Sequence, residues 1–183
     1  MAKIVVITGS PRNDGNSFAL TDAFIEAAIH NQNNIVRFDT AFSNLSGCRA
    51  CKQCFQHGRA CVFDDDFNSI AEAILDSDAV VFSLPVYWYS FPAQIKCVID
   101  KLYAFLVGGK RISGKKCALI ACCEEQDVSA FDPIRIAYEK SIKVLNWESV
   151  GEIYVPGVYS VGDIKRTDGC YRASQLADRF KVG

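Results

Sequence analysis

The sequence has no excess of charge of either sign and no long hydrophobic run. Its 183 residues carry 20 Lys and Arg against 21 Asp and Glu, a formal net charge of −1. This balance lacks the basic field with which proteins bind nucleic acid or anionic membranes. The longest apolar run, residues 117–123, has seven members and falls far short of a membrane span. We therefore expect no nucleic-acid or membrane partner, and the length predicts a single domain over residues 1–183.

Histidine and the common nucleotide-binding motifs are also scarce. Only His30 and His57 are present, and no nucleophile elbow accompanies either, which argues against a hydrolase triad. Neither the G-x-G-x-x-G pattern nor a full Walker A motif occurs. Residues 109–116 come close to Walker A, but Lys116 stands where Ser or Thr should hold Mg²⁺. We expect a solvated basic turn there, with at best a weak attraction for the phosphate of a nicotinamide cofactor.

Cysteine, by contrast, is abundant. The chain has nine cysteines, and its first hydrophobic stretch, residues 4–8, has only five members. A stretch this short is not expected to be a signal peptide. An odd number of cysteines without an export signal predicts a reducing cytoplasm, and thiols or metal ligands in place of a disulfide framework.

Short β-branched runs alternate with amphipathic helical patterns along the chain. We predict strands at residues 3–8, 34–38, 79–84, 116–121 and 150–155. The alternation with helices predicts right-handed crossovers and a parallel sheet. Five such strands favour a flavodoxin-like α/β fold, a three-layer sandwich with strand order 2-1-3-4-5. A cysteine-rich excursion at about residues 43–66 interrupts the pattern.

The helices between these strands carry recognisable signals. Asp64, Asp65 and Asp66 lie where negative charge favours the start of a helix. Ser90 can cap a later helix with Pro92 in its first turn. The spacing of three and four residues predicts that the buried face of this helix carries the apolar residues Ile95, Val98, Ile99, Leu102 and Leu106. Two further helices are expected at residues 132–145 and 171–180.

The loop after the first strand, residues 9–17, has the composition of a phosphate site. Gly9 and Gly15 permit close backbone approach, and Arg12 offers a forked cation. The next helix would point free N–H groups toward an anion. Hydroxyl and amide groups come from Ser10, Asn16 and Ser17. A solvated strand–helix turn is the alternative interpretation.

The loop after the third strand places three aromatic residues in succession, Tyr87, Trp88 and Tyr89. Consecutive aromatics cannot all face one core, so we expect at least one to cover a flat ligand or a partner subunit. In a doubly wound sheet this loop meets the first one at the ligand-binding edge. Together they predict a site for a phosphorylated flat heterocycle.

The ordered motifs resemble the NAD(P)H-dependent FMN reductases of the flavodoxin-like superfamily. The resemblance rests on Gly9-Ser-Pro-Arg, Gly15-Asn-Ser, Leu84-Pro-Val-Tyr-Trp and Phe91-Pro-Ala-Gln-Ile-Lys. It implies FMN as the cofactor and NAD(P)H as the electron donor. By position, Ser10, Arg12, Asn16 and Ser17 would hold the phosphate. The ring would be lined by Pro85, Val86, Tyr87 and Trp88 and approached by Cys122 and Cys123, and Tyr87, Trp88 and Tyr89 would wall the substrate site. Cys-Cys-Glu-Glu at residues 122–125 departs from the glycine-rich segment expected there.

Four cysteines form the spacing C-x2-C-x2-C-x6-C: Cys48, Cys51, Cys54 and Cys61. The run resembles the iron–sulfur flavoprotein branch of the same family. Three thiolates within seven residues can wrap one iron–sulfur cluster, and a fourth completes the ligation. Structural zinc usually takes two separated C-x2-C pairs and is less natural here. A [4Fe–4S] cluster, a metal-free loop of thiols and zinc all stay open.

Two main functions follow from these interpretations. The first is an FMN-dependent oxidoreductase that uses NAD(P)H to reduce a quinone, a flavin or another small acceptor. The second is an iron–sulfur flavoprotein electron carrier that passes single electrons to a redox partner. A redox sensor built on a labile cluster is a third class. The aromatic loop also predicts a homodimer or homotetramer.

Overall fold

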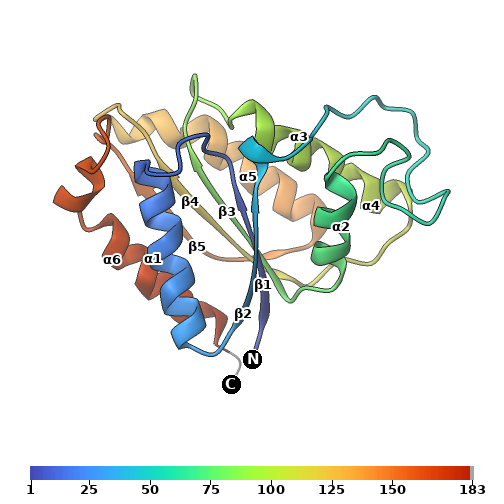
Figure 1. Cartoon of the computed structure of the whole chain (residues 1–183), viewed down its shortest axis with the longest axis horizontal. Helices are drawn as coiled ribbons and strands as arrows, with labels where there is room; N and C mark the ends of the chain where they lie inside the picture. The colour runs from blue at the N-terminus through green and yellow to red at the C-terminus, as the bar shows by residue number, and fades with distance from the viewer. Residues whose placement is uncertain (182–183) are drawn as a thin grey trace.

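The computed structural model describes residues 1–181, and its strands form one sheet in the order β2-β1-β3-β4-β5. All four neighbouring pairs are parallel. This arrangement confirms the predicted fold class and strand order (Figure 1). The five strands are β1 (Lys3–Thr8), β2 (Asn34–Asp39), β3 (Ala79–Pro85), β4 (Lys116–Cys122) and β5 (Glu148–Val155).

The strands run slightly beyond the apolar segments that predicted them. Asp39 pairs with Thr8, and Pro85 pairs with Cys122, so β2, β3 and β4 are each one residue longer than expected. Strand β5 begins two residues early, at Glu148, which pairs with Lys116. Pairing with the neighbouring strand continues for one or two residues past the predicted apolar segments of these strands, so the backbone hydrogen bonds and not the apolar pattern set where they begin and end.

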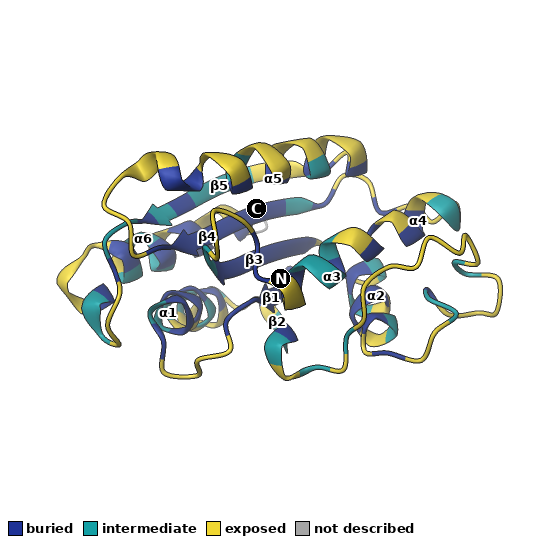
Figure 2. Ribbon diagram, turned by 90° about the horizontal axis from the view of Figure 1, so that it is seen from above, coloured by how far each residue is buried: buried dark blue, intermediate teal, exposed yellow. Residues whose placement is uncertain are grey.

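Helices cover both faces of the sheet and bury two cores. On one face, α1 (Asn16–His30) and α6 (Gly169–Leu176) pack Leu20 and Phe24 against Val6 and its neighbours. On the other, α2 (Phe67–Leu75), α3 (Ala93–Lys101) and α5 (Asp132–Leu145) enclose a second core. Figure 2 shows buried strands between helices whose outer faces are exposed. The three-layer sandwich is therefore confirmed.

Three details of the helices differ from the prediction. The element expected to reach Leu106 breaks at Leu102, and a separate helix, α4 (Tyr103–Val107), leaves Leu106 exposed. Ser90 is not a helix cap, because it pairs with Tyr87 while α3 begins after Pro92. The last helix is a short α6 followed by a 3₁₀ turn, Ala177–Phe180.

The cysteine-rich excursion follows a 3₁₀ turn, Thr40–Phe42, and ends where α2 begins at Phe67. It projects beside α2 and α4, at the right of Figure 1. Asp65 lies at the start of α2 as the sequence predicted, since its carboxylate accepts the Phe67 N–H at 3.1 Å, and the same carboxylate is buried against Lys101. Within the described part of the chain, no helix is both long and apolar enough to cross a membrane.

Candidate functional site

A cavity of about 340 Å³ lies at the carboxyl edge of the sheet, within the usual size range of small-molecule sites. The loops after β1, β3, β4 and β5 enclose it. Every residue predicted for the cofactor and the substrate wall lines this cavity: Ser10, Arg12, Asn16, Ser17, Pro85, Val86, Tyr87, Trp88, Tyr89, Cys122 and Cys123. The structure thus brings together residues that lie more than 100 positions apart in the sequence.

The loop after β1 is held close to the sheet by its own polar groups. Gly9 donates its N–H to the Ser83 carbonyl at 2.9 Å, and a Cβ at Gly9 would lie 2.9 Å from Ile95. Ser10 Oγ accepts the Arg12 N–H at 3.1 Å, and Gly15 N–H donates to the Arg12 carbonyl at 3.1 Å. A Cβ at Gly15 would meet that same carbonyl at 3.1 Å. The loop is a tight cradle that requires both glycines.

Helix α1 starts at the cradle with unsatisfied donors. Gly15 is its N-cap and supplies no side-chain cap. Among the described residues, none accepts a hydrogen bond from the N–H groups of Asn16, Ser17 or Phe18. Such groups, with the positive end of the helix dipole, form a ready site for an anion. Thr21 fixes the first turns by donating to the Ser17 carbonyl at 2.8 Å and lying 2.7 Å from Ser83 Oγ.

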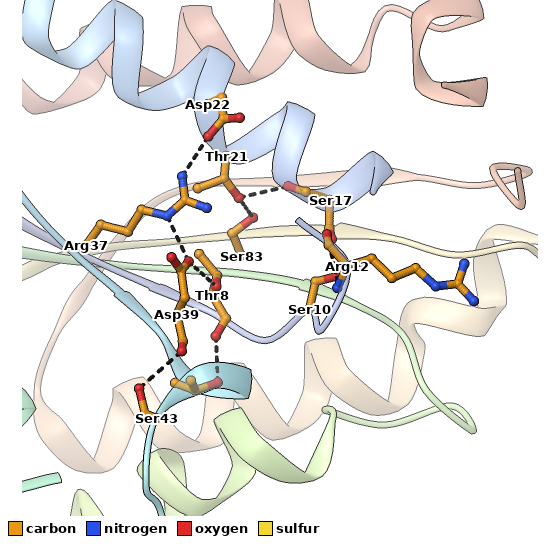
Figure 3. Close-up of polar contacts among 11 residues, drawn as sticks. Thr8, Ser10, Arg12, Ser17, Thr21, Asp22, Arg37, Asp39, Ser43 and Ser83 are labelled. Carbon is orange, nitrogen blue, oxygen red and sulfur yellow. Dashed lines mark hydrogen bonds and ion pairs between the residues drawn. The ribbon is translucent and has the colours of Figure 1, made fainter. Parts of the chain in front are cut away.

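A polar network stabilises the strand ends beside the cradle. Asp39 accepts hydrogen bonds from Thr8 Oγ1 and Arg37 Nε, each at 2.8 Å, and Arg37 also pairs with Asp22. Figure 3 shows Arg12 directed away from this network. Arg12 forms no ion pair with any described residue, so its guanidinium is available to a ligand at the cavity.

The aromatic loop after β3 is a strained hairpin. Tyr87 and Ser90 exchange backbone hydrogen bonds of 3.0 and 2.9 Å. Trp88 and Tyr89 between them have φ values of 48° and 58°, a combination usually supplied by Asn and Gly. Each such residue costs about 1–3 kcal/mol of backbone strain. Trp88 is 94% exposed, so this strain is not offset by burial of the indole.

Cys122 and Cys123 form a buried wall of the cavity. Burial raises the pKa of Cys122 to about 12, and Cys123 has a raised pKa for the same main reason. The Cys122 carbonyl accepts the Val86 N–H at 2.8 Å, which joins the loop after β3 to the end of β4. Thiols with raised pKa values are poor nucleophiles. These two cysteines therefore act as small apolar residues at this edge.

The loop after β5 also contributes to the cavity, and no sequence pattern predicted it. Val158, Tyr159 and Val161 also line the cavity, as do Glu124 and Glu125. Asn16 anchors the loop by donating from Nδ2 to the Ser160 carbonyl at 3.0 Å and accepting the Ile164 N–H at 3.2 Å. No short motif marks this loop. The separation of about 140 residues hides the contact that Asn16 makes.

The Walker-like turn, residues 109–116, lies away from the cavity. Lys116 begins β4 and donates its N–H to the Asp78 carbonyl, so the turn is at the amino edge of the sheet. Lys115 is buried and donates to the Ser77 carbonyl. The turn is thus only partly solvated, and its position at the edge opposite the cavity gives no support to an attraction for a nicotinamide cofactor.

The four cysteines of the excursion line a second, much smaller pocket of about 30 Å³ beside α2 and α4. Burial raises the pKa of Cys54, and the charges of Cys51, Cys48 and Cys61 add to that increase. Ala50, Lys52 and Phe55, which alternate with the cysteines, have φ values of 53°, 58° and 60°. Within residues 1–181, the structure contains no group of three or more His, Cys, Asp or Glu side chains that are close enough together to bind a metal ion, the four thiols included.

The fold and the cavity define a doubly wound α/β protein with a cavity at the point where the strand order reverses, which is where this class binds its ligands. A family model described as NADPH-dependent FMN reductase matches residues 2–130. That match covers more than half of the chain. The chain therefore belongs to this family, as its motifs indicated.

Individual relatives agree with this assignment. The chain is 30% identical over 103 residues to an iron–sulfur flavoprotein from Archaeoglobus fulgidus, covering 56% of this chain and 46% of that protein. It is 33% identical over 102 residues to an iron–sulfur flavoprotein from Methanosarcina thermophila, covering 54% and 51%. The chain thus spans about half the length of these curated relatives. An NAD(P)H:quinone oxidoreductase from Methanothermobacter marburgensis has the same fold, with a TM-score of 0.80, 16% identity and coverage of 100% and 97%.

Proposed function

We propose that this chain binds FMN in the carboxyl-edge cavity and uses NAD(P)H to reduce a quinone, a flavin or another small acceptor. The observation that carries the proposal is the meeting of an anion cradle and an apolar wall in one cavity. Family membership supports FMN as the cofactor. When bound, FMN supplies the electron-transfer chemistry, and the protein supplies binding and orientation.

The residues of the cavity fit the two chemically different ends of FMN. Ser10, Ser17 and the N–H groups at the start of α1 suit the phosphate, and the free guanidinium of Arg12 adds a charge-assisted contact. Asn16 would contribute mainly through its backbone, because its side chain is engaged by the loop after β5. Pro85, Val86, Cys122 and Cys123 present a mostly apolar surface suited to a flat ring system.

The aromatic hairpin would form the outer wall at which donor and acceptor bind in turn. Tyr87, Trp88 and Tyr89 are all substantially exposed at the mouth of the cavity. Steady-state oxidation of NADH and NADPH, with a quinone, a dye or free flavin as acceptor, tests this activity. We expect turnover with at least one nucleotide. Absence of turnover with both would favour the electron carrier described next.

The second candidate function is an electron carrier in which the cysteine quartet holds a [4Fe–4S] cluster. The left-handed residues between the cysteines support it, because alternating backbone conformations of this kind form concavities that bind anions, including iron–sulfur sites. The four thiols border one pocket, and their spacing is less natural for zinc, which usually takes two separated C-x2-C pairs. Iron and zinc analysis of anaerobically purified protein tests this candidate, and iron near zero would reject it.

The assembly and the compartment complete the proposal. Trp88, Tyr89 and Tyr159 leave aromatic surface exposed around the cavity, which supports a homodimer or homotetramer that covers it. Light scattering at micromolar concentration tests this, and a monomer would contradict it. All nine cysteines are unpaired, which suits a reducing compartment, and we place the protein in the cytoplasm.

A further inference from the structure

Lys101 and Asp65 form a buried ion pair between α3 and the cysteine excursion. Their side chains are only 4% and 3% exposed. Among the ion pairs of residues 1–181, no other has both partners buried to this extent. The proposed activity at the FMN cavity does not use this pair, because the pair lies beside the cysteine pocket.

Asp65 closes the base of the excursion. One carboxylate oxygen accepts the Ser46 N–H at 3.2 Å as well as the Lys101 ammonium, and the other accepts the Phe67 N–H at 3.1 Å. Ser46 precedes the first cysteine of the quartet and Phe67 follows the last. The Asp65 carboxylate therefore ties together the two ends of the segment that carries all four thiols. Beside it, Asn44 donates its N–H to Asp66 Oδ2 at 2.7 Å, and the Asn44 carbonyl accepts the Asp66 N–H at 3.0 Å.

Several other contacts hold the later part of the excursion, and two of them involve the segment next to a cysteine. Asn68 Oδ1 accepts the N–H of Cys61 at 2.7 Å, which fixes the fourth cysteine to α2. The ring of Phe55 packs 5.8 Å from that of Phe105, over Gly108, where a Cβ would lie 2.3 Å from the ring. These contacts lie near Cys54 and Cys61, whereas Asp65 acts on the start of the excursion, two residues before Cys48, through its hydrogen bond with Ser46.

A buried charge pair is a weak source of net stability, because desolvation offsets much of the attraction. Its better-attested use is to select one arrangement of the chain over others. Here Lys101 itself lines the pocket that the four cysteines border. Its ammonium thus supports Asp65 from inside the structure, at the wall of that pocket.

We propose that Lys101 is a positioning residue for the cysteine quartet: by holding Asp65, it keeps both ends of the excursion together and the four thiols at one pocket. The inference rests on the proposed cluster site for its functional meaning. The closure of the excursion, however, belongs to the metal-free chain and can be measured there.

The first test is amide hydrogen exchange on the full-length, metal-free protein. Lys101→Met keeps the length of the side chain and removes its charge, and we expect residues 44–66 to lose protection while α1 and the central strands keep theirs. Lys101→Arg should restore protection. Lys115→Met is the matched control, since Lys115 is another buried lysine but lies at the amino edge of the sheet.

The second test reconstitutes the same proteins anaerobically with ferrous iron and sulfide, then measures iron loss to a chelator. Loss of a supporting contact around metal ligands typically weakens metal binding by roughly 10–100-fold, and we expect Lys101→Met to release iron faster by a similar factor. Lys101→Arg and Lys115→Met should behave as the parent protein does. The midpoint of unfolding is recorded for each variant, so that loss of the whole fold is recognised.

The outcomes separate this inference from the proposed function. Unchanged exchange in residues 44–66 of Lys101→Met would overturn the positioning role, whatever the iron content. Loss of protection in a protein that takes up no iron would support the positioning role and reject the cluster site. FMN binding, measured on the same samples, is expected to stay unchanged in Lys101→Met because the cavity lies at the sheet edge.

Discussion

Tyr89 donates a hydrogen bond from its phenol to Glu125 Oε1 at 3.1 Å and thereby joins the loop after β3 to the loop after β4. The contact lies at the exposed mouth of the cavity, where both residues are lining groups. Glu125 also fixes the loop after β5, because its carbonyl accepts the Gly157 N–H at 2.8 Å. Three of the loops around the proposed FMN site are thus connected through one glutamate.

The titration of Tyr89 reports this contact. The hydrogen bond to Glu125, followed by the negative charge of that carboxylate, raises the pKa of the phenol above its ordinary value. Both effects favour the protonated phenol, so Glu125→Gln should lower the pKa of Tyr89. Ultraviolet difference titration measures it, and Tyr89→Phe identifies the signal. An unchanged tyrosine pKa in Glu125→Gln would show that the two loops are not joined in solution.

Arg12→Ala should weaken FMN retention. The guanidinium has no ion-pair partner among the described residues, so the variant removes a ligand contact without exposing a buried charge. A charge-assisted hydrogen bond of this kind contributes about 1.5–3 kcal/mol. Fluorescence titration with FMN measures the loss. Arg111→Ala, in the turn at the opposite edge of the sheet, is the control, and equal affinities for the two variants would count against the phosphate assignment.

Relief of the strain in the aromatic hairpin should make the protein more stable and its acceptor site weaker. Asn and Gly are the preferred residues at the two positions occupied by Trp88 and Tyr89. The double variant Trp88→Asn, Tyr89→Gly should therefore raise the free energy of unfolding by at least about 2 kcal/mol, since it relieves backbone strain at both positions. It should also raise the KM for the acceptor, because the outer wall is lost. Denaturant unfolding and steady-state kinetics measure the two effects, and a less stable variant would refute the strain argument.

The cysteines should differ sharply in alkylation. Cys48 and Cys51 are exposed, whereas burial raises the pKa of Cys117 to about 11 and that of Cys122 to about 12. Iodoacetamide reacts with thiolates, so at about pH 8 the metal-free native protein should be modified first at Cys48 and Cys51. Peptide mass spectrometry gives the order. Early modification of Cys122 would mean that the wall of the cavity opens readily.

Local sequence patterns predicted most of the fold, because each strand and long helix carries its own hydrophobic periodicity. Helix α5 has the predicted bounds, Asp132–Leu145. The patterns did not predict the break after Lys101. At this position the Lys101 side chain turns inward and pairs with Asp65, which lies 36 residues earlier. A contact with so distant a residue does not show in the local spacing of apolar residues.

The candidate site was predictable where short motifs carry its chemistry and not where tertiary contacts supply it. The cradle at Ser10 and Arg12 and the aromatic loop line the cavity as their composition indicated. Val158 and Tyr159 reach the same cavity only because Asn16 anchors their loop. The position of the Walker-like turn was likewise not predictable from its own residues, because the turn precedes β4 and the topology of the sheet places it at the amino edge.

The visible absorption spectrum of the anaerobically purified protein, recorded before and after addition of NADH or NADPH, tests the central claim most directly. After incubation with FMN and removal of the excess, we predict the two visible bands of bound flavin and their bleaching by at least one nucleotide. A broad additional absorbance would indicate iron–sulfur in the cysteine quartet. A protein that retains no flavin bands, or whose bands neither nucleotide bleaches, would contradict an NAD(P)H-dependent FMN oxidoreductase.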